Sequence, residues 1–314
     1  MRVIKQRNNP ILITGIHRSG TTWIGKMIAE SPDVAYVSEP LNRWHRSGVF
    51  RANVKYWYTY IHDENEDDFL PAYKEIMMYK YHLWAEIKSI RSRKDFFRMW
   101  RDYYRMWHGR IRHARILFKD PFAIFSLPWF AQRLGCKIVI MIRHPAGFVS
   151  SLNRLGWGFD LNDLLVQSSL MKNILNPFKG EINFVLNSKS DIITQASLLW
   201  KIVYSVVLDY RKNFPEFYYL RHEDISRQPL DEFRKLFSYL DVDYSQQIHS
   251  NIIKSSASRN PKELSVNRVH AVRLDSKSNL ENWKQRLSRE EILRIYEITH
   301  NVADHYYKDE DWWS

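Results

Sequence analysis

The sequence predicts an α/β fold in which a central parallel sheet is flanked by helices. A β-branched run at Ile11–Thr14 leads through a glycine-rich turn into a helical pattern from Thr21 to about Glu30, which is how a βαβ unit begins. A second apolar run, Lys137–Ile142, is followed by a helical pattern from about Ala146 to Arg154. Because strands alternate with helices and the strand runs are strongly apolar, we expect parallel strands that are buried on both faces.

The segment between these two units has a different composition. Residues 56–118 are dense in Trp, Tyr, Arg and Lys, and their periodicity predicts helices near 69–91 and 94–112. Residues 63–68 read Asp-Glu-Asn-Glu-Asp-Asp and precede the first of them, where acidic side chains favour the positive end of the helix dipole. We interpret residues 56–115 as a helical, aromatic and basic insertion.

The C-terminal half continues the alternation. Residues 156–192 carry Gly, Pro and Asn and predict a partly looped insertion. An amphipathic helix at 193–213, a short strand at Phe217–Leu220 and helices at 231–240 and 289–306 follow. Since no internal repeat or Pro- or Ser-rich linker interrupts the chain, residues 1–314 are predicted to form a single domain.

Composition restricts the class of protein. The chain has 314 residues, of which 45% are hydrophobic and 15% aromatic, so it can bury a substantial core and is not expected to be disordered. Its 47 Lys and Arg against 35 Asp and Glu give a net charge of +12, which favours anionic partners such as nucleotides, acidic glycans, nucleic acid or an anionic membrane.

Cysteine content and hydropathy give an expected compartment. Cys136 is the single cysteine, which excludes an internal disulfide. The N-terminal apolar run Ile11–Ile13 is too short for a signal peptide, and we expect no apolar stretch of about 18 residues or more that could span a bilayer. A cytoplasmic protein is therefore expected.

The strongest local motif is the turn after the first strand. It reads Gly15-Ile16-His17-Arg18-Ser19-Gly20-Thr21-Thr22-Trp23 and opens a helix, a context in which backbone N–H groups bind phosphate. Its glycine spacing matches the nucleoside-triphosphate loop G-x-x-x-x-G-K-[ST], but Thr21 stands where that loop has its lysine, and the cation is at Arg18. Two hydroxyls at the end of the loop suit one phosphate without a metal. The alternative function is that of a P-loop nucleotide kinase or NTPase. The structural alternative is a glycine-rich turn that only connects the strand to the helix and binds no phosphate.

This loop resembles the 5′-phosphosulfate loop of the sulfotransferases that depend on 3′-phosphoadenosine 5′-phosphosulfate (PAPS). The resemblance implies a three-layer P-loop-type fold and a 5′-phosphate site made by five consecutive residues, which are Arg18, Ser19, Gly20, Thr21 and Thr22.

A second match resembles the 3′-phosphate site of that family. Arg143-His144-Pro145 ends the second predicted strand, and Ser151 follows eight positions after Arg143. The resemblance implies that Arg143 and Ser151 bind the 3′ phosphate, as a guanidinium fork and a hydroxyl donor can. Taken alone, Arg143 is also consistent with an ordinary cation at a strand end.

A third match is closest to the tyrosylprotein sulfotransferases and their bacterial relatives. Lys119-Asp120-Pro121 resembles their cofactor-contacting lysine motif, and Glu39 falls where they place a catalytic glutamate. The resemblance implies in-line transfer of the sulfuryl group to a hydroxyl acceptor, with Glu39 as general base and with Lys119 and Arg18 stabilising charge on the departing oxygen. The structural alternative is that Glu39 pairs with a cation such as Arg43.

Two departures from the family pattern concern later segments. His222 stands where the family usually has tyrosine, and the Arg-Lys-Gly motif of cytosolic sulfotransferases is missing. Val272-Arg273-Leu274, ahead of Asn282-Trp283, is a candidate for a late cofactor-binding loop. No metal is expected, since His45, His108, His113 and His144 lack the spacing of zinc ligands.

The expected acceptor is a glycan, a glycolipid or a small molecule, and a tyrosine peptide is less favoured. Nucleic acid is not an expected partner, because no recognised binding module is present.

The aromatic and basic stretch Tyr79–Arg115 has two interpretations. Amphipathic helices would pack their aromatic side chains inward, whereas an acceptor wall would use them to stack on sugar or tyrosine rings. A peripheral membrane contact through its basic, aromatic face also fits this composition.

Overall fold

A computed structural model of the chain describes residues 9–263 and 272–313. The chain divides into two compact units, and it passes from one to the other several times. Unit 1 takes the described parts of Met1–Gly15, Thr21–Val139 and Arg234–Ile248. Unit 2 takes the described parts of Ile16–Gly20, Ile140–Phe233 and His249–Ser314.

The fold is α/β, with a central parallel sheet flanked by helices, as predicted. Five strands follow one another in the order β2-β3-β1-β4-β5. Their bounds are β1 (Ile11–Gly15), β2 (Val34–Ser38), β3 (Arg115–Lys119), β4 (Lys137–Ile142) and β5 (Tyr218–Arg221). β3 pairs in parallel with both β1 and β2, and Ser38 lies opposite Lys119, so β2 and β3 end side by side.

Two of these strands, β2 and β3, were not among those predicted. Each has five residues and adjoins a segment of strong helical periodicity, which hides a short apolar run. β5 lies one residue later than the predicted strand Phe217–Leu220. The predicted strands β1 and β4 are confirmed.

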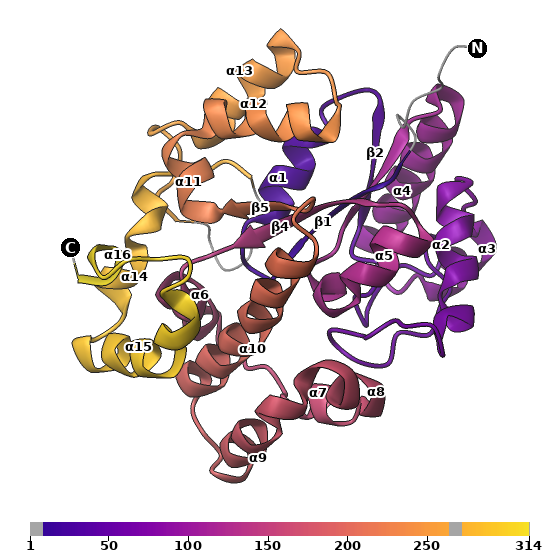
Figure 1. Ribbon diagram of the computed structural model, residues 1–314. Coiled ribbons are helices and arrows are strands. Elements are labelled where there is room, and N and C mark those ends of the chain that lie inside the picture. The colour runs from indigo at the N-terminus through magenta and orange to yellow at the C-terminus, as the bar shows by residue number, and fades with distance from the viewer. Residues whose placement is uncertain (1–8, 264–271, 314) are drawn as a thin grey trace. The chain divides into compact units, whose positions relative to one another are not determined.

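Unit 1 contains the helices of the aromatic and basic segment. Its complete helices are α1 (Thr21–Ile28), α2 (Leu70–Met77), α3 (Leu83–Ser89), α4 (Arg93–Arg112) and α5 (Leu127–Arg133). The prediction of one helix near 69–91 is wrong, because the chain turns between α2 and α3. Tyr79 has a φ of 57° there, a left-handed conformation that a right-handed helix cannot continue. α3 and α4 lie side by side (Figure 1).

The C-terminal half is more helical than predicted. Its helices are α6 (Pro145–Leu155), α7 (Asn162–Leu165), α8 (Ser168–Leu170), α9 (Lys179–Asn187), α10 (Ile192–Asn213), α11 (His222–Arg227), α12 (Pro229–Leu240), α13 (Gln246–Ser256), α14 (Asn282–Arg286), α15 (Arg289–Ala303) and α16 (Glu310–Trp313). The partly looped insertion predicted for 156–192 is therefore corrected, because short helices and a π-helical turn at Met171–Leu175 fill most of it. In unit 2, α6, α10 and α15 pack against one another (Figure 1).

α10 is the one helix among the described residues that is long and apolar enough to cross a membrane. We expected no such stretch, and α10 corrects that expectation. However, 61% of its apolar stretch is buried, and Trp200 and Tyr204 on it are completely so. A core helix of a folded unit has these properties, since it must be apolar on most of its faces.

α4 approaches β2 closely at one glycine. A Cβ on Gly109 would collide with the Tyr79 ring and would lie 3.0 Å from the Cβ of Ala35. The Tyr79 ring has little freedom to move, because its hydroxyl donates a hydrogen bond to the carbonyl oxygen of Ala114. The close packing of α4 on β2 therefore requires a residue without a side chain.

We predict that Gly109→Ala lowers the free energy of unfolding by about 1–3 kcal/mol, because overpacking outweighs the better helix propensity of alanine. Gly180→Ala is the matched control, since a Cβ on this α9 residue meets nothing within 4 Å. It should leave stability unchanged or raise it by up to about 1 kcal/mol. Chemical denaturation of both variants measures the difference, and equal stabilities would contradict the packing argument.

Candidate functional site

In unit 1, Glu39 and Lys119 meet where two parallel strands end. Glu39 follows the last residue of β2, and its backbone N–H donates a 2.7 Å hydrogen bond to the carbonyl oxygen of Lys119. A φ of 50° at Glu39 turns the chain out of the strand. The side chains form an ion pair between Lys119 Nζ and Glu39 Oε1. The register of β2 on β3 thus brings together two of the three predicted catalytic residues.

The pair sits in a mostly dry environment. Lys119 is 1% exposed, whereas the Glu39 side chain keeps 19% of its surface accessible. Burial alone would lower the pKa of Lys119, but the nearby Glu39 and Tyr36 outweigh it and raise that pKa. Lys119 therefore stays a cation. Asn42 Nδ2 donates a 2.7 Å hydrogen bond to the other carboxylate oxygen of Glu39, so both oxygens are held in place.

Asp120 fixes the segment that carries Glu39. Its Oδ2 accepts a 2.6 Å hydrogen bond from Leu41 N–H, and its Oδ1 accepts one of 3.0 Å from Phe122 N–H. Burial raises the pKa of Asp120 to about 7, against the two backbone hydrogen bonds that lower it. Asp120 and Asn42 had no role in the sequence-based site, although an aspartate directly before a proline is a common helix N-cap.

Cations gather beside this pair. α1 lies close to it, because a Cβ on Gly25 would be 2.9 Å from the Tyr36 ring and 3.2 Å from Lys119 Cγ. Burial, together with the charges of Arg105, Lys119 and Arg101, lowers the pKa of Lys26. The Arg105 guanidinium lies 5.9 Å from the centre of the Tyr36 ring. This part of unit 1 is therefore strongly electropositive.

In unit 2, the loop Ile16–Gly20 is a tight turn. Ser19 N–H donates a 3.1 Å hydrogen bond to Ile16 C=O, and Arg18 and Gly20 have φ values of 66° and 97°. A Cβ on Gly20 would lie 2.8 Å from Nδ1 of His222. Both its backbone conformation and its close neighbour therefore require glycine at position 20.

Polar atoms of the loop fit an anion. Ser19 Oγ is buried and has no hydrogen-bond partner among the described residues, a state that native structures normally avoid. Thr21 and Thr22 are the first two residues of α1, where backbone N–H groups lack partners within the helix. A phosphate oxygen would satisfy such donors.

Arg18 connects the loop to the second predicted motif. Its Nε donates a 3.2 Å hydrogen bond to Ser151 Oγ, and its carbonyl oxygen accepts one of 2.5 Å from Arg143 Nη1. Burial, with the charges of Arg143 and Arg154, lowers the pKa of Arg18 to about 10. Unit 2 thus brings Arg18, Arg143 and Ser151 together and gathers positive charge that an anion would stabilise.

Arg143 is held by residues that sequence patterns did not identify. Trp200 Nε1 donates a 2.8 Å hydrogen bond to the carbonyl oxygen of Arg143. Glu223 Oε1 accepts one of 3.0 Å from His144 N–H, and Glu223 Oε2 accepts one of 2.9 Å from the Tyr307 hydroxyl. These partners come from distant parts of the chain, so no local motif could reveal them.

His222 is buried against the loop. Neither ring nitrogen has a hydrogen-bond partner among the described residues. Burial and the charge of Arg143 lower its pKa to about 3, so the ring is neutral at physiological pH. His222 is one of the two departures from the family pattern, and its position next to Gly20 places this departure beside the loop.

Other predicted features lie elsewhere. Arg273 of the candidate late loop is exposed, and the residues just before Val272 lie outside the described part of the chain. His17 packs edge-on against Phe148, with ring centres 5.4 Å apart. Within residues 9–263 and 272–313, no group of three or more His, Cys, Asp or Glu side chains could hold a metal ion.

Of the two interpretations of the stretch Tyr79–Arg115, inward packing of the aromatic side chains does not describe the outer side of α4. Its Trp100 and Trp107 are 49% and 48% exposed, and Tyr104 is 57% exposed. Met99, Met106 and Gly109 form its buried side instead. Packing on β2 requires small or flexible residues, which leaves the aromatic rings outside.

Comparison with known proteins gives the family. The model of the sulfotransferase domain matches residues 8–307. Similar solved structures include the sulfotransferase domain from the curacin biosynthetic pathway (15% identity, 92% of this chain and 96% of that chain covered, TM-score 0.47). Another is the sulfotransferase domain from the Synechococcus PCC 7002 olefin synthase (14% identity, 98% of this chain and 98% of that chain covered, TM-score 0.48).

A third is mouse sulfotransferase SULT7A1 complexed with PAP (12% identity, 98% of this chain and 87% of that chain covered, TM-score 0.46). No curated protein matches this chain. The family model spans nearly the whole sequence, and this protein therefore belongs to the sulfotransferase family.

Proposed function

We propose that this sulfotransferase moves the sulfuryl group of PAPS to a hydroxyl acceptor, with Glu39 as the general base. The observation that carries the proposal is the ion pair of Glu39 with Lys119, in which the carboxylate is partly accessible and the ammonium is buried. A partly accessible carboxylate can accept a proton from a bound hydroxyl, and a fixed cation beside it can stabilise negative charge nearby.

The donor would be bound through its two phosphates. Arg18, Ser19, Gly20, Thr21 and Thr22 suit the 5′ phosphate, since the loop offers N–H groups, hydroxyls and a cation. Arg143 and Ser151 suit the 3′ phosphate as a charged fork and a hydroxyl donor. In support, Arg18 is already hydrogen bonded to Ser151 and to Arg143, so one anionic ligand can meet both motifs.

PAPS, when bound, supplies an activated sulfuryl group on a phosphate leaving group. Glu39 takes the proton of the acceptor hydroxyl as the acceptor oxygen forms its bond to sulfur and the bond from sulfur to the phosphate oxygen breaks. The family resemblance assigns to Lys119 and to Arg18 the role of stabilising the negative charge that develops on that phosphate oxygen. Asn42 and Asp120 keep Glu39 oriented, which matters because transfer depends on alignment.

The charge around Glu39 supports an anionic acceptor. Lys26, Arg101 and Arg105 add positive charge near Lys119, as the lowered pKa of Lys26 indicates. A hydroxyl acceptor that also carries acidic groups suits these surroundings, which favours an acidic glycan, a glycolipid or a small anionic molecule. A kinase or NTPase is not favoured, because Thr21 stands at the position of the phosphate-loop lysine.

The direct test is incubation of the enzyme with radiolabelled PAPS and an extract of its host, followed by identification of the labelled product. Transfer of label to a hydroxyl compound supports the proposal. Calorimetry with adenosine 3′,5′-bisphosphate tests the donor site independently of the acceptor. Absence of binding, or magnesium-dependent ATP hydrolysis, would contradict the proposal.

We predict that Glu39→Gln lowers kcat by about 10²–10⁴-fold, because glutamine keeps the size of the side chain but cannot accept the proton. The affinity for adenosine 3′,5′-bisphosphate should stay within about threefold of wild type, since Glu39 does not bind a phosphate. Glu64→Gln is the matched control, because the Glu64 side chain is 86% exposed. If Glu39→Gln turned over at the wild-type rate, Glu39 would have no part in the chemistry.

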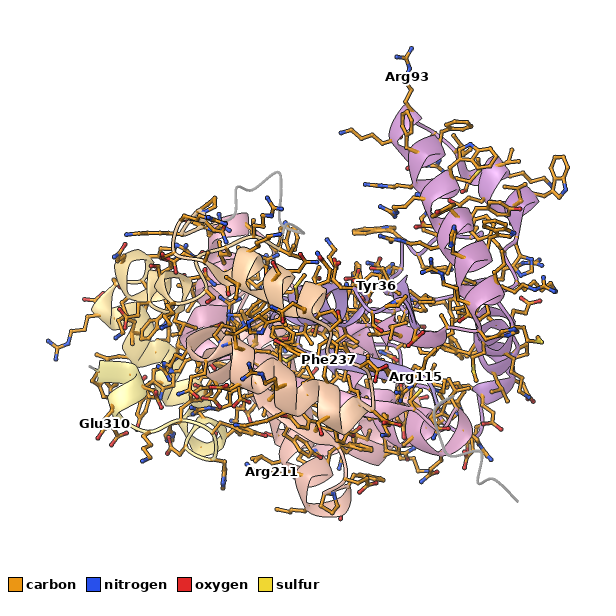
Figure 2. All side chains as sticks on the ribbon, turned by 90° about the horizontal axis from the view of Figure 1, so that it is seen from above. Tyr36, Arg93, Arg115, Arg211, Phe237 and Glu310 are labelled. Carbon is orange, nitrogen blue, oxygen red and sulfur yellow. The ribbon has the colours of Figure 1, made fainter. Side chains whose placement is uncertain are left out.

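We predict that Arg143→Ala weakens binding of adenosine 3′,5′-bisphosphate by about tenfold or more while affecting adenosine 5′-monophosphate much less, because the lost charge serves the 3′ phosphate. Calorimetry measures both affinities. Arg211→Ala is the matched control, since Arg211 is exposed on α10 and is labelled in Figure 2. If the alanine variant does not fold, Arg143→Lys serves as the second variant. It keeps the positive charge but lacks the two-pronged guanidinium, so it should also weaken binding of the bisphosphate. Equal losses for the two nucleotides would contradict the assignment.

A further inference from the structure

The outer side of α4 carries an unusual run of large apolar side chains. These residues are between 38% and 72% exposed, and they are Phe96, Phe97, Trp100, Tyr103, Tyr104, Trp107 and Ile111. They recur at helical spacing, so they form one stripe along the helix. We call this set the aromatic stripe. An ordinary surface helix turns its apolar stripe toward the core, and α4 does not.

The rings of the aromatic stripe touch one another. Trp100 lies between Phe96 and Tyr103, with ring centres 6.2 Å and 6.0 Å away. Tyr104 and Trp107 are 6.4 Å apart. The exposed rings therefore form two contacting groups along one side of the helix, and a large exposed apolar surface of this kind marks an interaction site. On α3, which lies beside α4, Trp84 is also 78% exposed.

Positive charge runs along one side of the aromatic stripe. Five basic residues recur at intervals of three, four or seven positions, which aligns them on the helix, and they are Lys94, Arg98, Arg101, Arg105 and Arg112. α4 as a whole contains seven Lys or Arg against two Asp. Arg93, at the start of α4, extends away from the rest of the protein in Figure 2.

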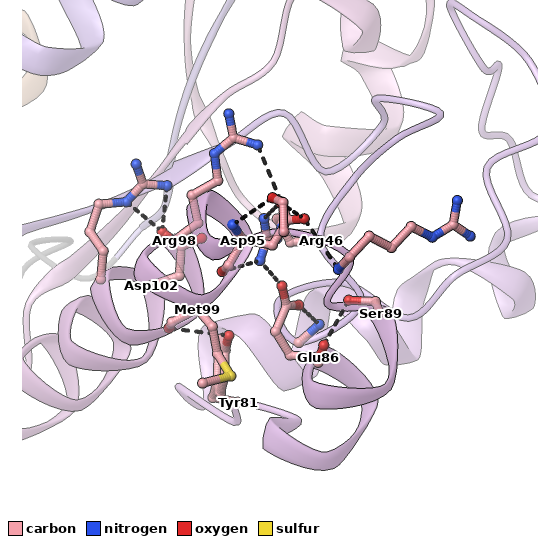
Figure 3. Close-up of polar contacts among 12 residues, drawn as sticks. Arg46, Tyr81, Glu86, Ser89, Asp95, Arg98, Met99 and Asp102 are labelled. Carbon is pink, nitrogen blue, oxygen red and sulfur yellow. Dashed lines mark hydrogen bonds and ion pairs between the residues drawn. The ribbon is translucent and has the colours of Figure 1, made fainter.

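Ion pairs hold this surface in one position, as Figure 3 shows. Arg46 pairs with buried Glu86 of α3 and lies 3.5 Å from Asp95 of α4. Glu86 Oε2 also accepts a 2.6 Å hydrogen bond from Gly48 N–H. The Ser92 hydroxyl caps the start of α4 by accepting from Asp95 N–H. One charge network thus joins the loop at 46–48, α3 and the first turn of α4, so the surface is preformed.

We propose that the aromatic stripe and its basic neighbours dock this protein on an anionic membrane surface. Trp and Tyr prefer the headgroup level of a bilayer, where the ring is buried and the polar edge stays hydrated. Lys and Arg beside them contact lipid phosphates, and each contributes attraction to anionic lipids. Charge complementarity selects this occupant, because a second copy of α4 would bring like charges together. The inference does not depend on the proposed function.

The test is flotation of the full-length protein with vesicles of phosphatidylcholine alone and with phosphatidylglycerol added. We expect binding to the vesicles that contain phosphatidylglycerol, little binding to phosphatidylcholine alone, and loss of binding at high salt. The W100S/W107S variant should partition at least about tenfold less, because two interfacial anchors are lost. The K94Q/R112Q variant should bind about twentyfold more weakly, because two cations near the surface are removed.

Phe97→Ser and Phe184→Ser form a matched pair, since both phenylalanines are 72% exposed but only Phe97 lies on the aromatic stripe. Phe97→Ser should weaken vesicle binding, and Phe184→Ser should not. Thermal melting should show that all these variants stay folded, because the replaced side chains are exposed.

Two results would overturn the inference. The first is a failure of the vesicle test, in which the wild-type protein binds neither kind of vesicle or in which W100S/W107S and K94Q/R112Q bind as well as wild type. The other is a wild-type dimer in sedimentation that becomes a monomer in W100S/W107S, which would assign the aromatic stripe to contact between two copies of the chain.

Discussion

The structure of unit 1 depends on the burial of one charge. An ammonium group at 1% exposure is costly unless a partner compensates it, and Lys119 has that partner in Glu39. The pairing requires β2 and β3 to run parallel with Ser38 opposite Lys119, so that the two strands end together. It also requires the left-handed residue that turns the chain after β2. Removal of the Glu39 carboxylate would leave the Lys119 ammonium buried without this partner.

Unit 2 instead places two cations close to each other. Arg18 and Arg143 are close enough to lower the pKa of Arg18, although burial contributes most to that change. Arg143 Nη1 donates to the backbone carbonyl oxygen of Arg18, and Arg18 Nε donates to Ser151 Oγ. Positive charges that are held in a fixed geometry form a preorganised site for an anion. The fold holds these cations together against their mutual repulsion, and an anion that binds there would relieve it.

α4 serves three purposes with three sides. Gly109 and the two buried methionines pack toward β2, where space is limited. Arg105 lies over Tyr36 and adds to the positive charge around Lys119. The aromatic stripe takes the side that remains. A single helix can combine these tasks because 3.6 residues per turn distribute successive side chains around its axis.

The sequence determined the class of fold and most of the residues of the candidate site. The loop Gly15–Trp23 and the strand end at Arg143 are local motifs, because phosphate binding by a turn and a helix start needs residues that are adjacent in the chain. Lys119 and Glu39 were identified only through the resemblance of their motifs to a known family, because the strands that end beside them were not predicted. Family membership confirms the activity class that those motifs predicted.

Tertiary structure decided what depends on long-range packing. The break at Tyr79, the strands β2 and β3, and the supporting contacts of Asp120 and Glu223 arise between segments far apart in sequence. Periodicity showed that α4 is amphipathic, but not which of its sides would face the core. That choice was made by volume, because only the side with Gly109 can approach β2 closely enough, and the larger aromatic side chains were left outside.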